Sequence, residues 1–487
     1  MERSQERDGG EGMARREPGV GGLQLRREIG LWSAVSLMAG CMIGSGIFMS
    51  PQGVLVYMGS SGASLVVWAA CGLLAVMGAL CYAELGALVP KSGGEYAYIL
   101  QIFGSLPAFL VIYTFVLLVR PAAIAAVSLS LAEYAVAPFY SGCSSMPQAV
   151  LKGVAATCIL LLMLVNCWSS RLTTMLMNVC TVAKVFSLLI IVVGGAVVLS
   201  QGHGHTEAFL FAFHNTTHQS GRIGMAIYQG MWSFDGWNNV NYVVEELKNP
   251  KQNLVWAVMI AIPLVTSLYL LVNISYLLVL SPTEILSSDA MAVSWGNQVL
   301  GAWAWLVPLA VVLSTFGSAN GAFFGGSRVC YAAAREGHMP QLLSMVHVHR
   351  LTPTPALMFT SAVALILVIP GSFGTIVNFL SFLGWITYGT TIGCLLYLRI
   401  KKKNLPRPYK VPTIVPVIML LASLYLVLAP VIDHPQIEFL YIFLFLLSGI
   451  PVYFLFVYCQ CQPKCLQMAT LYLQLLLEVA PTAKNVD

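Results

Sequence analysis

Charged residues are scarce in this sequence. Asp, Glu, Lys and Arg make up 9% of its 487 residues, and hydrophobic residues make up 58%. Soluble domains carry roughly 25% charged residues. A soluble core cannot bury so much apolar surface, so the composition excludes a soluble protein and indicates an all-α protein with many membrane spans. The net charge of +5 does not indicate nucleic-acid binding, because the positive residues fall in short loops and set orientation in the membrane.

The sequence also lacks the motifs of an enzyme. It contains no P-loop, no His-Glu-x-x-His pair and no nucleophile elbow with partner residues. We therefore expect no enzymatic activity, no cofactor and no bound metal. Cys459, Cys461 and Cys465 form a weak metal-binding pattern, for which acylation beside the membrane and unmodified thiols are the alternatives. Cys41 and most other cysteines lie in apolar runs and are expected to pack as small hydrophobic residues. The apolar stretch 466–477 could lie as a helix on the inner leaflet.

Twelve stretches are apolar and long enough to cross a membrane, since a helical span needs about 20 residues. They cover residues 31–56, 62–89, 101–138, 148–168, 172–200, 222–246, 253–281, 298–334, 355–370, 375–399, 412–432 and 437–458. Together they predict a membrane domain over residues 30–458. The polar residues 1–29 do not resemble a signal peptide and are predicted to be a disordered cytosolic tail. Residues 459–487 are predicted to be a second cytosolic tail.

The distribution of Lys and Arg predicts that both termini are cytosolic, because positive loops stay on the cytoplasmic side. Loops on the side of the N-terminus hold most of these residues, among them Lys91, Arg171 and Lys401. The sequon at Asn215 then falls in an outer loop, where glycosylation is expected to be allowed. A second sequon, at Asn273, falls inside the seventh span and is not expected to be modified.

The first span is interrupted at its centre by Gly44-Ser45-Gly46. Glycine weakens helices, and unwound backbone is tolerated in a bilayer only where it is buried in protein or lines a cavity. Unwinding here would free backbone N–H groups between Ile43 and Ile47 at the start of a half-helix, whose partial positive charge suits a carboxylate. A small-residue packing face is the alternative. The sequence favours a binding site because a second break follows.

The sixth span is interrupted in the same way by Trp232-Ser233-Phe234-Asp235-Gly236. Carbonyl groups freed at the end of its first half can accept from a substrate ammonium. Asp235 is costly at this depth, so we predict that it pairs with a cationic substrate side chain or, as the alternative, with a cation of the protein. Trp232 and Phe234 are predicted to close over the substrate as a gate, and ordinary packing is the alternative.

Two such breaks at corresponding places in the chain are typical of a transporter binding site. Their spacing predicts five helices over about 31–200, five more in inverted topology over about 222–400, and two extra helices over 412–458. The breaks therefore predict that the chain moves a small zwitterion across a membrane.

Other charged residues within the predicted spans include Lys184, Glu84, Glu133 and Arg120. Lys184 lies in the middle of the fifth span, where its ammonium must be paired or bonded to carbonyls. We predict that Lys184 lies near the first break and replaces a coupling sodium ion, with snorkelling to the interface as the alternative. Glu84, Glu133 and Arg120 lie nearer the ends of spans and are expected to serve structure.

Several longer motifs occur in order along the chain. They are residues 44–51 (GSGIFMSP), 84–86 (ELG), 92–96 (SGGEY), 235–238 (DGWN), 245–250 (EELKNP) and 335–339 (REGHM). Together they resemble the light subunits of heteromeric amino acid transporters, in the amino acid–polyamine–organocation superfamily. Within that family, Asp235 resembles the branch that exchanges cystine and dibasic amino acids for neutral ones. The chain is also similar to an aromatic-preferring relative, and Phe234 departs from the family's usual tyrosine.

The resemblance implies a five-plus-five inverted-repeat fold and sodium-independent, obligatory exchange of amino acids at the plasma membrane. It also implies a type II heavy-chain glycoprotein partner, joined by a disulfide from the outer loop between spans 3 and 4, where Cys143 lies. Two alternatives stay open. One is uniport or proton-coupled symport of amino acids or polyamines, with Lys184 or Asp235 titrating. The other is a non-transporting partner that helps a heavy chain to traffic.

Overall fold

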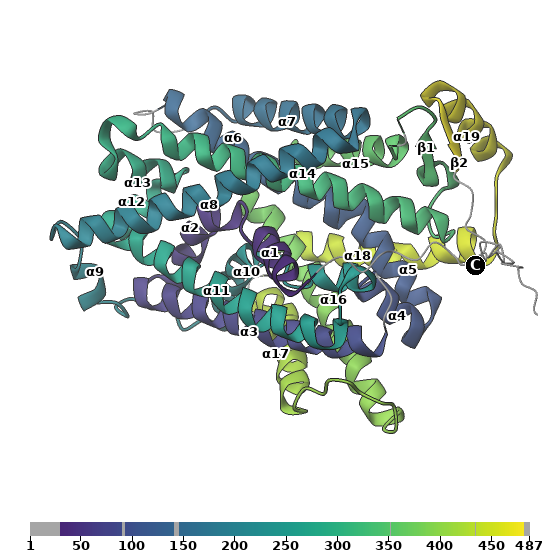
Figure 1. The fold of residues 1–487 in the computed structure, drawn as a ribbon, viewed down its shortest axis with the longest axis horizontal. Helices are drawn as coiled ribbons and strands as arrows, with labels where there is room; N and C mark the ends of the chain where they lie inside the picture. Colours follow the sequence, from purple (N-terminus) through teal and green to yellow (C-terminus); the bar gives the residue numbers. More distant parts are fainter. Residues whose placement is uncertain (1–29, 90–92, 141–145, 351, 434, 482–487) are drawn as a thin grey trace, which may run out of the picture.

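The computed structural model describes residues 30–89, 93–140, 146–350, 352–433 and 435–481, which form a bundle of long helices (Figure 1). In chain order the elements are α1 (Leu31–Met42), α2 (Gly46–Met58), α3 (Ser61–Leu88), α4 (Glu95–Phe103), α5 (Ser105–Thr114), η1 (Phe115–Val119), α6 (Arg120–Val136), η2 (Ala137–Tyr140), α7 (Gln148–Trp168), α8 (Ser170–Ser200), α9 (Glu207–Leu210), α10 (Ser220–Ser233), η3 (Asn239–Glu246), α11 (Pro250–Val279), α12 (Pro282–Ser287), α13 (Met291–Val299), η4 (Gly301–Trp303), α14 (Leu306–Arg335), η5 (Gln341–Ser344), β1 (Met345–His347), α15 (Thr354–Val368), α16 (Phe373–Lys401), α17 (Ile414–Asp433), α18 (Ile437–Val452), η6 (Tyr453–Tyr458), α19 (Lys464–Leu477) and β2 (Val479–Pro481).

Ten membrane spans are evident in the described part of the chain. Nine helices are long and apolar enough to cross a bilayer, and the bent pair of α1 and α2 makes a tenth span. The prediction of an all-helical membrane protein is therefore confirmed, together with a broken first span. The two remaining predicted spans fall on shorter helices. The ninth is α15, with 15 residues, and the sixth contains α10, with 14 residues, because the chain leaves the α-helix after Ser233.

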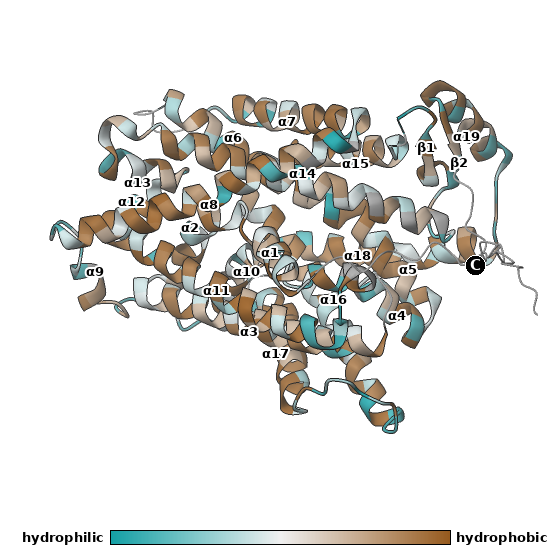
Figure 2. Cartoon of the chain, viewed as in Figure 1, coloured by the Kyte–Doolittle hydropathy of each residue, from teal (hydrophilic) through white to brown (hydrophobic). Residues whose placement is uncertain are grey.

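Apolar side chains cover the outside of the bundle as well as its interior. Figure 2 shows hydrophobic colouring along most helices and hydrophilic colouring at the connection between α16 and α17. Side chains such as Val182, Leu189 and Val193 of α8 and Leu421 of α17 are exposed. Apolar residues on the outer face are expected where the surrounding solvent is lipid.

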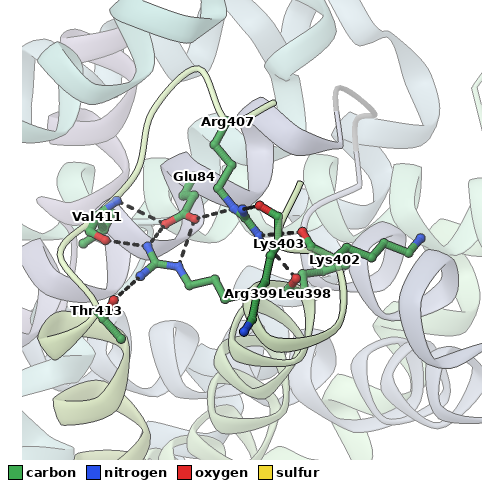
Figure 3. Close-up of polar contacts among 8 residues, drawn as sticks. All are labelled: Glu84, Leu398, Arg399, Lys402, Lys403, Arg407, Val411 and Thr413. Carbon is green, nitrogen blue, oxygen red and sulfur yellow. Dashed lines mark hydrogen bonds and ion pairs between the residues drawn. The ribbon is translucent and has the colours of Figure 1, made fainter. Parts of the chain in front are cut away.

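Glu84, near the end of α3, holds three parts of the chain together (Figure 3). Its carboxylate is buried, with Oε2 at 2.5 Å from the Arg399 Nη2 and Oε1 at 3.6 Å from the Arg407 Nε. The backbone N–H of Val411 donates to the same carboxylate at 3.2 Å, and Arg399 also donates to the Thr413 hydroxyl. A buried carboxylate needs such partners to offset its desolvation. This cluster therefore fixes the end of α16 and its connection to α17 against α3.

The C-terminal segment returns to the helix bundle through a small sheet. β2 pairs antiparallel with β1, with Met345 opposite Pro481 and His347 opposite Val479. Figure 1 shows α19, β1 and β2 together at the end of the bundle where the C-terminus lies. The predicted N-terminal tail, residues 1–29, lies outside the described residues.

Candidate functional site

The first break separates α1 from α2 and bends their axes by 53°. Ile43 follows α1 in an extended conformation, and Ser45 precedes the first residue of α2. The approach to the second break is close, because a Cβ at Gly46 would lie 2.6 Å from the Cα of Ser233. The first N–H groups of any helix have no acceptor within the helix itself. The start of α2 is therefore a source of free donors.

The second break follows α10, which ends at Ser233. Residues 234–238 form turns, and η3 continues as a 3₁₀ helix. The backbone N–H of Asp235 donates to the Trp232 carbonyl at 3.2 Å, which closes the helix end. Gly236 has a φ of +105°, a conformation that other residues rarely adopt, and a Cβ there would lie 3.0 Å from the Cβ of Cys41. The chain therefore leaves the α-helix within the sixth predicted span.

Tyr269, in the middle of α11, joins the two breaks. Its hydroxyl lies 2.6 Å from the carbonyl oxygen of Met42, the last residue of α1, and 2.7 Å from that of Ser233, the last residue of α10. A hydroxyl carries one proton, so it donates to one carbonyl at a time. Carbonyls at helix ends have no partner within the helix. Tyr269 therefore ties the ends of both half-helices to α11.

Lys184 of α8 reaches the first break. Its Nζ donates to the Gly40 carbonyl at 3.2 Å, and its side chain is buried. In a continuous helix this carbonyl would accept from the N–H of Gly44, so the break frees it for Lys184. Cations are stabilised at the carbonyl end of a helix. The ammonium therefore sits at the negative end of α1, next to the first break.

A cavity of about 660 Å³ lies between the two breaks and helices α6, α8, α14 and α16. Small-molecule sites typically enclose roughly 300–1,000 Å³. The sequence-predicted site residues that line it are Gly44, Ser45, Gly46, Lys184, Trp232, Asp235 and Gly236. The cavity also extends along α1 as far as Ser33. The structure thus brings parts of both breaks and Lys184 into one space.

Four other predicted site residues, Ile43, Ile47, Ser233 and Phe234, do not line this cavity. Phe234 is fully buried and packs edge-on against Tyr269, with ring centroids 5.1 Å apart. Phe234 therefore packs away from the cavity in this conformation, and its role as a gate stays a prediction. The Ser233 carbonyl, expected to receive a substrate ammonium, already has Tyr269 as its partner. Trp232 does face the cavity and contacts Phe373, with centroids 6.1 Å apart.

Charged side chains of both signs face the cavity. Asp235 is exposed to it and accepts from the backbone N–H of Gly236. Arg120 also lines it and interacts electrostatically with Asp235. The Arg120 Nε is buried and has no hydrogen-bond partner among the described residues, although the guanidinium lies over Phe115 at 4.9 Å. Arg120, expected to serve structure, therefore also shares a cavity with Asp235.

Sequence reasoning gave no site role to several residues around the second break. The Glu95 carboxylate lines the cavity and accepts from the Asn238 side chain at 2.5 Å and from the Tyr82 hydroxyl at 3.2 Å. Trp237 and Tyr388 add an aromatic wall, with centroids 5.0 Å apart. A polar residue inside an apolar run is the signal that could have drawn attention to Asn238. Nothing in the sequence pattern marks the aromatic pair.

The remaining predicted sites lie away from the cavity or outside the described residues. Asn215 is exposed in the connection between α9 and α10, with φ +63°. Asn273 is buried in α11 and donates to the Tyr269 carbonyl at 2.7 Å. Cys143 lies outside the described residues. Cys41, expected to pack in the core, instead is exposed and lines the cavity.

Comparison with known proteins gives concordant similarities. Residues 29–457 match the amino acid permease family. The chain is 47% identical over 465 residues to the b(0,+)-type amino acid transporter 1 of Mus musculus, covering 95% of each chain, and 46% identical over 465 residues to that of Homo sapiens, with the same coverage. It is 42% identical over 460 residues to the human large neutral amino acids transporter small subunit 2, covering 94% of this chain and 86% of the relative.

Proposed function

The chain belongs to the amino acid permease family, and from that premise we propose that it is a sodium-independent exchanger of neutral amino acids, dibasic amino acids and cystine. A permease moves its substrate without chemical change, so the chain is a transporter and not an enzyme. The observation that carries the proposal is the cavity of about 660 Å³ lined by both breaks. A zwitterion needs donors for its carboxylate and acceptors for its ammonium, and opposite helix ends supply them.

In the proposed binding mode, the N–H groups at Gly44, Ser45 and Gly46 hold the substrate α-carboxylate. The positive end of α2 favours an anion there. Carbonyl groups of the second break that are not bonded to Tyr269 hold the α-ammonium. The Lys184 ammonium donates to the Gly40 carbonyl and offsets the partial negative charge at the end of α1. In this role it takes the place of a coupling sodium ion.

The substrate side chain then points towards Asp235 and Arg120, which face the same cavity. Asp235 favours a cationic side chain, as in lysine. Arg120 opposes a cation and favours a side chain that carries a carboxylate. The far end of cystine carries both an ammonium and a carboxylate, so this pair of residues suits it. The aromatic wall of Trp237 and Tyr388 also supports an aromatic-preferring exchanger as a second candidate.

We propose the rest of the assembly from the family resemblance and from charge. The fold is a five-plus-five inverted repeat with discontinuous helices 1 and 6 and two extra helices. Cys143 forms a disulfide with a type II heavy-chain glycoprotein, and the complex resides in the plasma membrane with both termini cytosolic. The exposure of Asn215 supports glycosylation at an outer loop. The relative named as a small subunit supports assembly with a second chain.

Counterflow in proteoliposomes tests exchange. Vesicles preloaded with unlabelled leucine should take up labelled leucine, tyrosine, arginine and cystine without a sodium gradient, and empty vesicles should take up little. Uptake into empty vesicles that follows a proton gradient would instead establish symport. No uptake by the chain together with its partner would favour a trafficking role.

The charge-reading role of Asp235 is tested by Asp235→Ala and Arg120→Ala. A hydrogen bond to a charged group contributes about 1.5–3 kcal/mol, which corresponds to about 10- to 150-fold in affinity. We expect Asp235→Ala to reduce arginine uptake relative to leucine within that range, and Arg120→Ala to raise the same ratio. An equal loss of both substrates in Asp235→Ala would contradict the role and leave exchange itself untouched.

A further inference from the structure

Three exposed thiols gather directly after the last membrane span. Among the described cysteines, Cys459, Cys461 and Cys465 are exposed, and Cys41, the other exposed one, faces the central cavity. Cys459 follows η6 and its N–H bonds to the Phe454 carbonyl. The three thiols therefore lie within seven residues of one another at one boundary of the membrane.

The helix that follows, α19, exposes an apolar surface. It buries none of its 14 residues, and Met468, Tyr472 and Leu475 are each about two-thirds exposed or more. Its polar residues, Lys464, Gln467, Thr470 and Gln474, follow a helical period and fall on one side. The rest of the circumference is apolar. Such a helix is typical of a membrane interface, and water would not stabilise it.

The position of α19 is set at both of its ends. Five residues, 459–463, join it to η6, so its start stays within about 22 Å of the last span. After it, the Val348 N–H donates to the Glu478 carbonyl, and β2 pairs with β1. In Figure 1 the helix lies at the rim of the bundle. η6 also exposes apolar side chains, among them Leu455 and Tyr458.

We propose that α19 lies in the membrane interface on the side of the C-terminus, and that Cys459, Cys461 and Cys465 carry long-chain acyl groups that hold it there. The helix itself carries one basic residue, Lys464, so attraction to anionic lipid is weak. Firm attachment of an interfacial segment takes two signals, and an acyl chain supplies the second.

The modification is a transfer between thioesters. The sulfur of a cysteine thiol attacks the carbonyl carbon of a fatty acyl-coenzyme A, and a new carbon–sulfur bond forms as the old thioester bond breaks. The coenzyme leaves as its thiol with the proton, and nothing is oxidised or reduced. This proposal does not depend on which amino acids the chain transports.

Acyl exchange on the full-length chain in cell membranes tests the modification. Free thiols are blocked with a maleimide, thioesters are cleaved with neutral hydroxylamine, and the freed thiols are labelled with a polyethylene-glycol maleimide. We expect one to three hydroxylamine-dependent band shifts, all lost in the triple variant Cys459→Ser, Cys461→Ser, Cys465→Ser. The matched variant Cys41→Ser, at an exposed thiol elsewhere, should keep them. Absence of a shift, or its survival in the triple variant, would overturn the proposal.

Amide hydrogen exchange tests the position of the helix. In lipid nanodiscs, residues 464–477 of the acylated chain should exchange slowly, and cleavage of the thioesters on the same sample should speed their exchange several-fold. Amides of α11 should not change. Equal exchange of residues 464–477 before and after cleavage would show that the acyl groups do not hold the helix.

Discussion

Tyr269→Phe tests whether the two breaks act as one site. The ring of Tyr269 packs against Trp68 and Phe234, with centroids 5.9 and 5.1 Å apart, and phenylalanine keeps those contacts. The substitution removes only the hydroxyl, which serves the carbonyls of Met42 and Ser233 at 2.6 and 2.7 Å. It therefore frees both half-helix ends without opening a large cavity.

The expected magnitude follows from the loss of one donor. A buried carbonyl left without a partner costs about 1–3 kcal/mol. If that cost falls on the conformation that binds substrate, the apparent affinity for leucine falls about 5- to 150-fold. Counterflow in proteoliposomes measures this directly, with protein quantity and detergent-extracted thermal stability measured in parallel. We expect weaker binding to accompany normal insertion.

Tyr276→Phe provides the matched control. Tyr276 lies in the same helix, α11, and is equally buried, but its hydroxyl has no hydrogen-bond partner among the described residues. Removing an unpartnered hydroxyl should leave transport close to wild type. Equal losses in the two variants would mean that α11 tolerates no change. Wild-type transport by Tyr269→Phe would refute the claim that this residue couples the breaks.

Three further outcomes follow from the structure. Glu84→Gln leaves the two arginines of Figure 3 without their buried counter-charge and should lower the free energy of unfolding by about 3–5 kcal/mol. A lower temperature of thermal aggregation in detergent would report this loss. Burial lowers the pKa of His338, whose Nδ1 bonds the Tyr96 hydroxyl at 2.7 Å, with Glu336 opposing the shift. Stability should therefore fall as pH drops below about 6.5, because the unfolded chain then binds more protons, and His338→Asn should flatten that dependence. Gly236→Ala should cost about 1–3 kcal/mol through backbone strain and impair transport, whereas Gly393→Ala, with open space around its Cα, should behave as wild type.

The sequence predicts the membrane class and the first break because both depend on local pattern. A run of apolar residues and a glycine pair at its centre can be recognised without knowing what lies opposite. The same local rule overcounts spans where a helix stops early. The ninth predicted span becomes α15, with 15 residues, and the sixth divides at Ser233. Length alone does not show where a tertiary contact will end a helix.

Side-chain direction is the part that local pattern cannot supply. Phe234 and Asp235 are adjacent, yet one is buried against Tyr269 and the other faces the cavity. At a helix end the backbone turns, so the helical period no longer predicts which side a residue takes. Residue type predicts an aromatic gate of Trp232 and Phe234, and the turn after α10 places Trp232 alone of the two against the cavity. For the same reason the sequence does not distinguish Tyr269 from the other residues of its apolar run. Its role becomes visible only in the structure, where its hydroxyl lies beside the carbonyls of Met42 and Ser233.

Charge balance in the cavity shows why an aspartate within a span does not by itself specify a cationic substrate. Asp235 and Glu95 contribute two formal negative charges to the cavity wall, and Arg120 and Lys184 contribute two positive ones. A zwitterion enters such a site without changing its net charge, whereas a dibasic amino acid adds one positive charge. Under the proposed function, arginine uptake therefore depends on how its side-chain cation balances against Asp235 and Arg120. We therefore expect the ratio of dibasic to neutral transport to fall when Asp235 is removed and to rise when Arg120 is removed.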